Sequence, residues 1–134
     1  MYDINTFRIE KCQKGEPPIY EPGLEEVMQK TINHNLRFTT DIAEALDNAS
    51  VIFLALPTPT KNFGYQQGKA YDLSYTEVGI RSIVKFYNQN GMKNDVVVVE
   101  KSTVPIGTYE MLNTLINANS IEANKKRYTI ASNP

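Results

Sequence analysis

Short apolar runs alternate with segments of helical periodicity along the chain. Three runs have strand length, at residues 51–56, 96–99 and 128–131, and residues 36–39 form a shorter candidate. The run at 96–99 is four consecutive valines, which is typical of a strand buried on both faces inside a parallel sheet. We therefore expect strands at these runs, with the valine run buried on both faces.

Helical segments separate these runs. Residues 40 and 41 (Thr-Asp) predict a helix start, with Thr40 as N-cap and Asp41 in the first turn. Strands that alternate with helices predict an α/β fold with a parallel, doubly wound sheet and right-handed crossovers. The apolar positions that mark the four expected helices are Leu24, Val27, Met28, Ile32; Ile42, Ala45, Leu46, Ala49; Ile80, Ile83, Val84, Tyr87; and Tyr109, Leu112, Leu115, Ile116.

Polar residues and prolines follow two of the expected strands directly. Residues 57–60 read Pro-Thr-Pro-Thr and residues 100–105 read Glu-Lys-Ser-Thr-Val-Pro. Ligands of open α/β sheets bind beyond the carboxyl ends of the strands, so both segments are candidates for a site. A helix beginning near Pro105 is an alternative reason for the preceding hydroxyls, which would then cap it. The loop over residues 57–72, with Gly64 and Gly68, is long enough to suggest a function.

Composition narrows the class of protein. The 134 residues carry 14 Lys and Arg against 15 Asp and Glu, a net charge of −1 that gives no electrostatic reason to expect nucleic acid or an anionic membrane as partner. The single cysteine, Cys12, excludes an internal disulfide and fits a reducing compartment. No apolar run approaches the length of a membrane span, and the first residues do not open a signal peptide. We expect a soluble, cytoplasmic domain.

A set of ordered segments occurs along the chain at residues 3–5 with Arg8, 18–24, 57–60, 68–70 with 72–73, 100–105 and 132–134. Together these segments resemble the UDP-glucose 6-dehydrogenase family, within the wider nucleotide-sugar 6-dehydrogenases. Single pieces such as a Thr-Pro pair are weak, but the ordered set spans almost the whole chain. The fullness of the segments at 19–24 and 100–105 favours UDP-glucose as substrate.

The resemblance implies a Rossmann-type domain that binds NAD, in an enzyme that oxidises C6 of UDP-glucose to give UDP-glucuronate and reduces two NAD. It also implies a cysteine nucleophile in a C-terminal UDP-sugar half, and a homo-oligomer at full length. No G-x-G-x-x-G motif occurs. We therefore expect residues 1–134 to be a partial NAD-binding domain without the first strand and glycine-rich loop. The central helix and the C-terminal domain would lie outside it.

The resemblance assigns Asp3 and Arg8 to the adenosine half of the cofactor. A carboxylate at the end of a strand accepts hydrogen bonds from the ribose hydroxyls and repels a 2′-phosphate, which favours NAD over NADP. The residues alone leave simpler alternatives open. Asp3 is equally a turn or cap residue, and Arg8 is equally an exposed helical arginine.

The resemblance also assigns residues at the two polar segments. It makes Thr103 an active-site hydroxyl near the reacting carbon, with a positioning role rather than a nucleophilic one. Pro57 replaces an asparagine found in some relatives, so a side-chain hydrogen bond cannot be carried over there. The expected cofactor contacts in these segments are Leu56, Pro57, Thr58, Pro59, Thr60 and Ser102.

Other polar residues have structural explanations. Glu100 and Lys101 follow a buried strand, so we expect each to find a partner, and a catalytic acid–base pair is the lesser alternative. Cys12 lies on an early helix far from any base, and apolar packing explains it. His34 reads as a polar helix-end residue, and one histidine with one cysteine makes no metal-ligand set.

Two expectations concern the isolated chain. It should form no NADH from UDP-glucose and NAD, and loss of a central strand should leave it poorly folded or self-associating. Two rival interpretations remain. One is a dehydrogenase of GDP-mannose or of an N-acetylated UDP-hexosamine, and the other is a non-catalytic interaction module derived from a dehydrogenase.

Overall fold

The computed structural model describes residues 1–62, 65 and 67–133. Gly64 in the long loop and Pro134 in the final matching segment lie outside the described residues. The chain forms two compact units, Met1–Asp47 and Asn48–Pro134. Each unit is described by itself.

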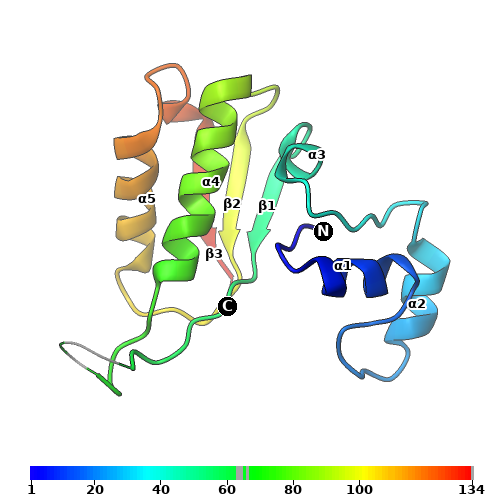
Figure 1. The fold of residues 1–134 in the computed structure, drawn as a ribbon. Coiled ribbons are helices and arrows are strands. Elements are labelled where there is room, and N and C mark those ends of the chain that lie inside the picture. Colours follow the sequence, from blue (N-terminus) through cyan, green and yellow to red (C-terminus); the bar gives the residue numbers. More distant parts are fainter. Residues whose placement is uncertain (63–64, 66, 134) are drawn as a thin grey trace. The chain divides into compact units, whose positions relative to one another are not determined.

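The second unit contains a parallel three-stranded sheet in the order β1-β2-β3 (Figure 1). The strands are β1 (Val51–Leu54), β2 (Val96–Glu100) and β3 (Tyr128–Ser132). β2 is central, with Val97 opposite Val51 on one side and Thr129 on the other. Parallel pairing and the burial of the valine run are confirmed. Four of the five residues in β2 are buried.

Two helices pack against each other on one face of this sheet, α4 (Ser74–Asn90) and α5 (Thr108–Asn119) (Figure 1). Both were predicted from the spacing of their apolar residues. The 3₁₀ helix η1 (Lys125–Arg127) leads into β3. Each fully buried aliphatic or aromatic side chain contributes about 1.5–3 kcal/mol, so this layer supplies much of the stability of the unit. Its most buried members are Ile80, Val84, Tyr87, Leu112 and Ile116.

Two boundaries differ from the prediction. β1 ends at Leu54 rather than Leu56, because the backbone of Leu56 bonds to the side chain of Ser102 and not to the neighbouring strand. α5 begins at Thr108 rather than near Pro105, after Gly107 adopts a left-handed φ of 90°. Gly107 provides no side-chain cap, so capping of this helix by Ser102 or Thr103 is wrong.

The first unit contains α1 (Thr6–Gln13), α2 (Leu24–Thr31) and α3 (Ile42–Leu46). The N-cap of α3 is Asp41 rather than Thr40, because the Asp41 carboxylate accepts the Ala43 N–H at 2.8 Å. The strand expected at residues 36–39 is also wrong: Thr39 pairs with Tyr2 in an isolated bridge. The core of this unit is Ile9, Cys12, Met28 and Phe38, with Leu24, Ile32 and Leu36 against it.

Candidate cofactor-binding site

Ser102 joins the two polar segments that follow β1 and β2. Its hydroxyl donates to the Leu56 carbonyl at 2.7 Å and accepts the Leu56 N–H at 3.1 Å. Ser102 and Leu56 are 46 positions apart, yet one side chain satisfies both backbone groups of Leu56. The hydroxyl therefore fixes the spacing of two loops at the carboxyl edge of the sheet, where ligands of this fold class bind.

A second contact ties the same loops together further out. The Thr58 hydroxyl donates to the Thr103 carbonyl at 3.2 Å. Thr103 is exposed, and it takes part in this contact through its backbone carbonyl rather than its hydroxyl. The structure thus brings together four of the expected residues, Leu56, Thr58, Ser102 and Thr103, and leaves the Thr103 side chain accessible.

The remaining residues of the first segment lie on an exposed stretch whose end is closed by backbone bonds. Pro57, Pro59 and Thr60 are exposed. Thr60 forms an antiparallel bridge with Tyr71, and the Asp72 N–H donates to the Pro59 carbonyl at 2.7 Å. Because proline restricts φ and has no N–H, this stretch is stiff and presents carbonyl and hydroxyl oxygens as acceptors.

Glu100 and Lys101 each find a partner, as expected, but not each other. Glu100 is 2% exposed, and its Oε1 accepts the Ser102 N–H at 2.9 Å. The Lys101 ammonium donates to Asn133 Oδ1 at 3.1 Å, beyond the end of β3. The two side chains therefore serve different neighbours, which does not support an acid–base pair.

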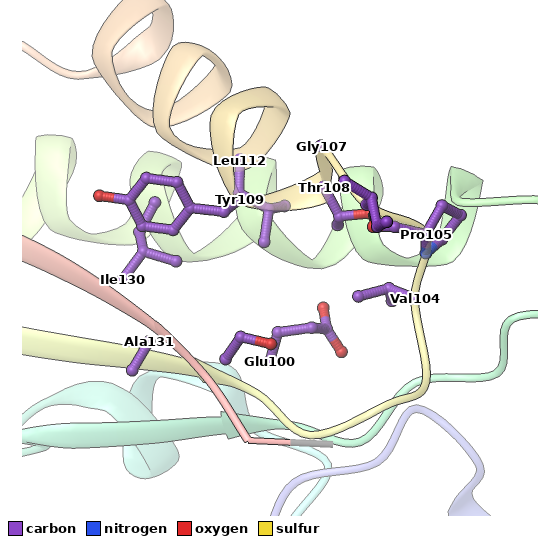
Figure 2. A pocket seen from close by; sticks show the side chains of 11 residues that line it. Glu100, Val104, Pro105, Gly107, Thr108, Tyr109, Leu112, Ile130 and Ala131 are labelled. Atoms are coloured by element: carbon purple, nitrogen blue, oxygen red, sulfur yellow. Dashed lines mark hydrogen bonds between the residues drawn. The ribbon is translucent and has the colours of Figure 1, made fainter.

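A cavity of about 250 Å³ lies between the end of β2, β3 and the start of α5 (Figure 2). Glu100 reaches into it from β2 and points toward Val104. Thr108, Leu112 and Ile130 are among the other lining residues. The sequence analysis did not predict this cavity, since its lining depends on where α5 begins.

Sequence analysis also missed the role of Gly79, which lies inside α4. A Cβ on this residue would lie 2.8 Å from Leu56 Cδ1, so glycine lets the helix approach the candidate segment. The signal was available in the sequence, because glycine inside a helical pattern often marks a close packing contact.

Asp3 and Arg8 form their own cluster in the first unit. Arg8 Nη1 donates to Asp3 Oδ2 at 2.7 Å, and the Asn5 N–H donates to Asp3 Oδ1 at 2.9 Å. Asn5 in turn caps α1 through the Arg8 N–H. These contacts agree with the simpler alternatives for Asp3 and Arg8, and the cofactor role of the two residues stays a prediction. Each carboxylate oxygen retains acceptor capacity for a further donor.

Cys12 packs in the hydrophobic core of the first unit. The Cys12 side chain is fully buried, and burial raises the pKa of its thiol, which agrees with a packing role. Among the described residues, no group of three or more His, Cys, Asp or Glu side chains is placed to hold a metal ion. No helix in the described ranges is both long and apolar enough to cross a membrane.

The chemistry of the expected residues fits a dinucleotide. A carboxylate with spare acceptor capacity suits ribose hydroxyls, and hydroxyls with carbonyls at a stiff strand end suit a nicotinamide nucleotide. In the second unit the Thr103 side chain is exposed, and in the first unit the Asp3 side chain is partly exposed, at 22%, so each by itself is accessible to a ligand.

Comparison with known proteins gives a consistent result. The family model for the NAD binding domain of the UDP-glucose/GDP-mannose dehydrogenase family matches residues 1–134. UDP-glucose 6-dehydrogenase 4 of Oryza sativa subsp. japonica is 42% identical over 132 residues, which cover 98% of this chain and 26% of the relative. The chain thus spans about a quarter of the length of the curated relatives that it matches.

Solved structures agree with the sequence matches. A ternary complex of GDP-mannose dehydrogenase from Pseudomonas aeruginosa has a TM-score of 0.85 at 29% identity, over 99% of this chain and 29% of that one. A UDP-glucose dehydrogenase from Pyrobaculum islandicum has a TM-score of 0.81 at 32% identity, over the same shares. The expected Rossmann-type fold and the NAD cofactor are confirmed. The chain belongs to the UDP-glucose/GDP-mannose dehydrogenase family, in which it matches the NAD-binding domain.

Proposed function

We propose that this chain forms most of the NAD-binding half of a longer enzyme that oxidises C6 of UDP-glucose. The alcohol and one water would become a carboxylate, and two NAD would take up the four electrons as two hydrides. The supporting observation is the 42% identity to UDP-glucose 6-dehydrogenases over 98% of the chain. UDP-sugar binding and covalent chemistry would come from residues outside positions 1–134.

In this proposal the chain binds and orients the cofactor. Asp3 accepts hydrogen bonds from the adenosine ribose, beside Arg8. Leu56, Pro57, Thr58, Pro59, Thr60 and Ser102 line the cofactor cleft, and the three hydrogen bonds made by the Ser102 and Thr58 hydroxyls support this assignment because they hold the segments in one arrangement. Bound NAD would accept the hydride, while the Thr103 hydroxyl would position the substrate hydroxyl or a water.

GDP-mannose and N-acetylated UDP-hexosamines are the alternative substrates. The high TM-score to a GDP-mannose dehydrogenase favours GDP-mannose, but several curated relatives at 41–42% identity carry the UDP-glucose name. Because the sugar is read mainly by residues outside this chain, fold likeness weighs less than the ordered sequence match. UDP-glucose is therefore the proposed substrate.

The test is NADH formation by the longer protein with each nucleotide sugar. We expect UDP-glucose to give two NADH per sugar, and GDP-mannose and UDP-N-acetylmannosamine to give rates at least tenfold lower. A preference for either of the others would overturn the substrate assignment. The 134-residue chain alone should form no NADH, since its one cysteine, Cys12, is buried in the core of the first unit, and measurable turnover would overturn this division of labour.

We also propose a cytoplasmic enzyme that assembles as a homo-oligomer at full length. The buried, unpaired Cys12 supports a reducing compartment. The family resemblance supports the assembly. Light scattering on the longer protein tests the second point, and a monodisperse monomer at micromolar concentration would contradict it.

A further inference from the structure

Glu100 is a charged residue at the end of the central strand whose burial is almost complete, at 2% exposed. Charged side chains are seldom buried unless they are paired or hydrogen-bonded, so such a position calls for a specific reason. Backbone bonds fix the strand end around it: the Lys101 N–H donates to Leu54 O at 2.9 Å, and the Asn133 N–H donates to Glu100 O at 3.0 Å.

The Glu100 carboxylate holds Ser102, one of the expected cofactor contacts. Glu100 Oε1 accepts the Ser102 N–H at 2.9 Å, only two positions along the chain. This bond turns the backbone directly after β2. The Ser102 hydroxyl then reaches both backbone groups of Leu56, at 2.7 and 3.1 Å. Glu100 therefore touches the proposed cofactor segments through Ser102 and does not itself belong to them.

The second carboxylate oxygen has a different environment. Oε2 is buried and has no hydrogen-bond partner among the described residues. It lies by the cavity of about 250 Å³, whose walls include Val104, Leu112 and Ile130 (Figure 2). An amide nitrogen in place of Oε2 would break no hydrogen bond within the described chain, and the cavity leaves room for it. Only Oε1 has a contact to lose.

We propose that Glu100 is a positioning residue for NAD binding, which acts by holding Ser102 so that the loops after β1 and β2 keep one arrangement. This inference rests on the proposed function. The contact requires an acceptor oxygen at the reach of a glutamate side chain. It does not require the negative charge.

Three variants of the longer protein distinguish the effect of side-chain length at position 100 from the effect of its negative charge. Glu100→Gln keeps an acceptor oxygen at the same reach, Glu100→Asp keeps the charge but withdraws it by one methylene, and Glu100→Ala removes both. We expect Kd for NAD to stay within about threefold of wild type in Glu100→Gln and to rise about 10- to 100-fold in the other two, because both of those place no acceptor oxygen within reach of the Ser102 N–H and leave that group unpaired. KM for the nucleotide sugar should stay within about twofold in all three.

A matched control and a second readout keep the result interpretable. Glu26→Ala removes an exposed glutamate from α2 and should leave Kd for NAD unchanged. Hydrogen exchange at the Leu56 amide should speed up in Glu100→Asp and Glu100→Ala only. If Glu100→Ala does not fold, the comparison of Kd for NAD between Glu100→Gln and Glu100→Asp tests the proposal. The inference is overturned if aspartate binds NAD as wild type does, or if glutamine binds as weakly as alanine. A wild-type protein that binds no NAD would instead overturn the proposed function.

Discussion

Replacing Ser102 with alanine removes one hydroxyl that serves both backbone groups of Leu56. The two hydrogen bonds, at 2.7 and 3.1 Å, each contribute about 0.5–1.5 kcal/mol net, so we expect a local loss of about 1–3 kcal/mol. Leu56 lies beyond the end of β1, and no ladder partner replaces the hydroxyl. The loop after β1 should therefore open more often, and the cofactor segment should lose its fixed spacing.

Hydrogen exchange at the Leu56 amide in the longer protein measures this loss directly. Because 1.4 kcal/mol corresponds to a factor of ten, about 1–3 kcal/mol predicts exchange roughly 5- to 150-fold faster in Ser102→Ala. Kd for NAD should rise in the same variant, since the opened loop must be ordered again on binding.

Ser82→Ala is the matched control for this experiment. The Ser82 hydroxyl donates to Val78 O at 2.9 Å within α4, and alanine is the best helix former, so we expect stability within about 0.5 kcal/mol of wild type. Exchange at Leu56 should not change. If Ser102→Ala exchanges within twofold of wild type at Leu56, the hydroxyl does not hold the two loops together and the reasoning fails.

Three further predictions follow from individual contacts. Cys12 is fully buried with a raised pKa, so a thiol reagent at pH 8 should label it only at the rate of unfolding, and labelling that is fast without denaturant would contradict its packing role. Burial raises the pKa of Tyr128 from 10 to about 12, so its contribution to stability is complete below pH 10 and is lost as the pH rises toward 12; Tyr128→Phe should flatten this part of a pH–stability curve. Gly79→Ala should change stability by less than about 1 kcal/mol, because gained helix propensity offsets displacement of the Leu56 side chain, yet it should weaken NAD binding in a titration.

The strands could be predicted from sequence because β-branched runs signal burial, and their parallel order followed from the intervening helices. The end of β1 could not be predicted, since it depends on a side chain 46 positions away. The start of α5 could not be predicted because Pro105 and Gly107 favour different first residues for this helix. Pro105 suits a first helical turn, but the left-handed Gly107 delays the helix and the Thr108 hydroxyl bonds back to Pro105 O at 2.7 Å.

The candidate site was predictable at the level of segments. Two polar stretches after neighbouring parallel strands must share one sheet edge, and the contacts Ser102–Leu56 and Thr58–Thr103 meet that expectation. Which atoms meet was not predictable, because a hydroxyl can serve as cap, ligand or inter-loop contact with the same neighbours in sequence. A partner for Glu100 was expected, but its bond to Ser102 required the backbone turn after β2.

The sequence analysis also predicts, from Asp3, that the protein prefers NAD to NADP. The substitution Asp3→Ser tests this preference. The Asp3 carboxylate holds Arg8 at 2.7 Å and would repel the 2′-phosphate of NADP. Serine removes the charge but keeps an oxygen able to accept the Asn5 N–H, so the turn before α1 should survive. The freed guanidinium of Arg8, already 51% exposed, then becomes available to a phosphate.

Two unit charges about 4 Å apart interact by about 4 kcal/mol near a protein surface, and salt screens part of this repulsion. We therefore expect Asp3→Ser to lower Kd for NADP at least tenfold and to raise Kd for NAD, measured by titration of the longer protein. Asp95→Ser is the matched control. It removes a carboxylate that pairs with Arg127 at 2.8 Å and should leave the ratio of Kd for NADP to Kd for NAD unchanged. If the ratio of Kd for NADP to Kd for NAD does not change in Asp3→Ser, Asp3 does not belong to the adenosine site. Its role would then be limited to the turn in which it accepts the Asn5 N–H.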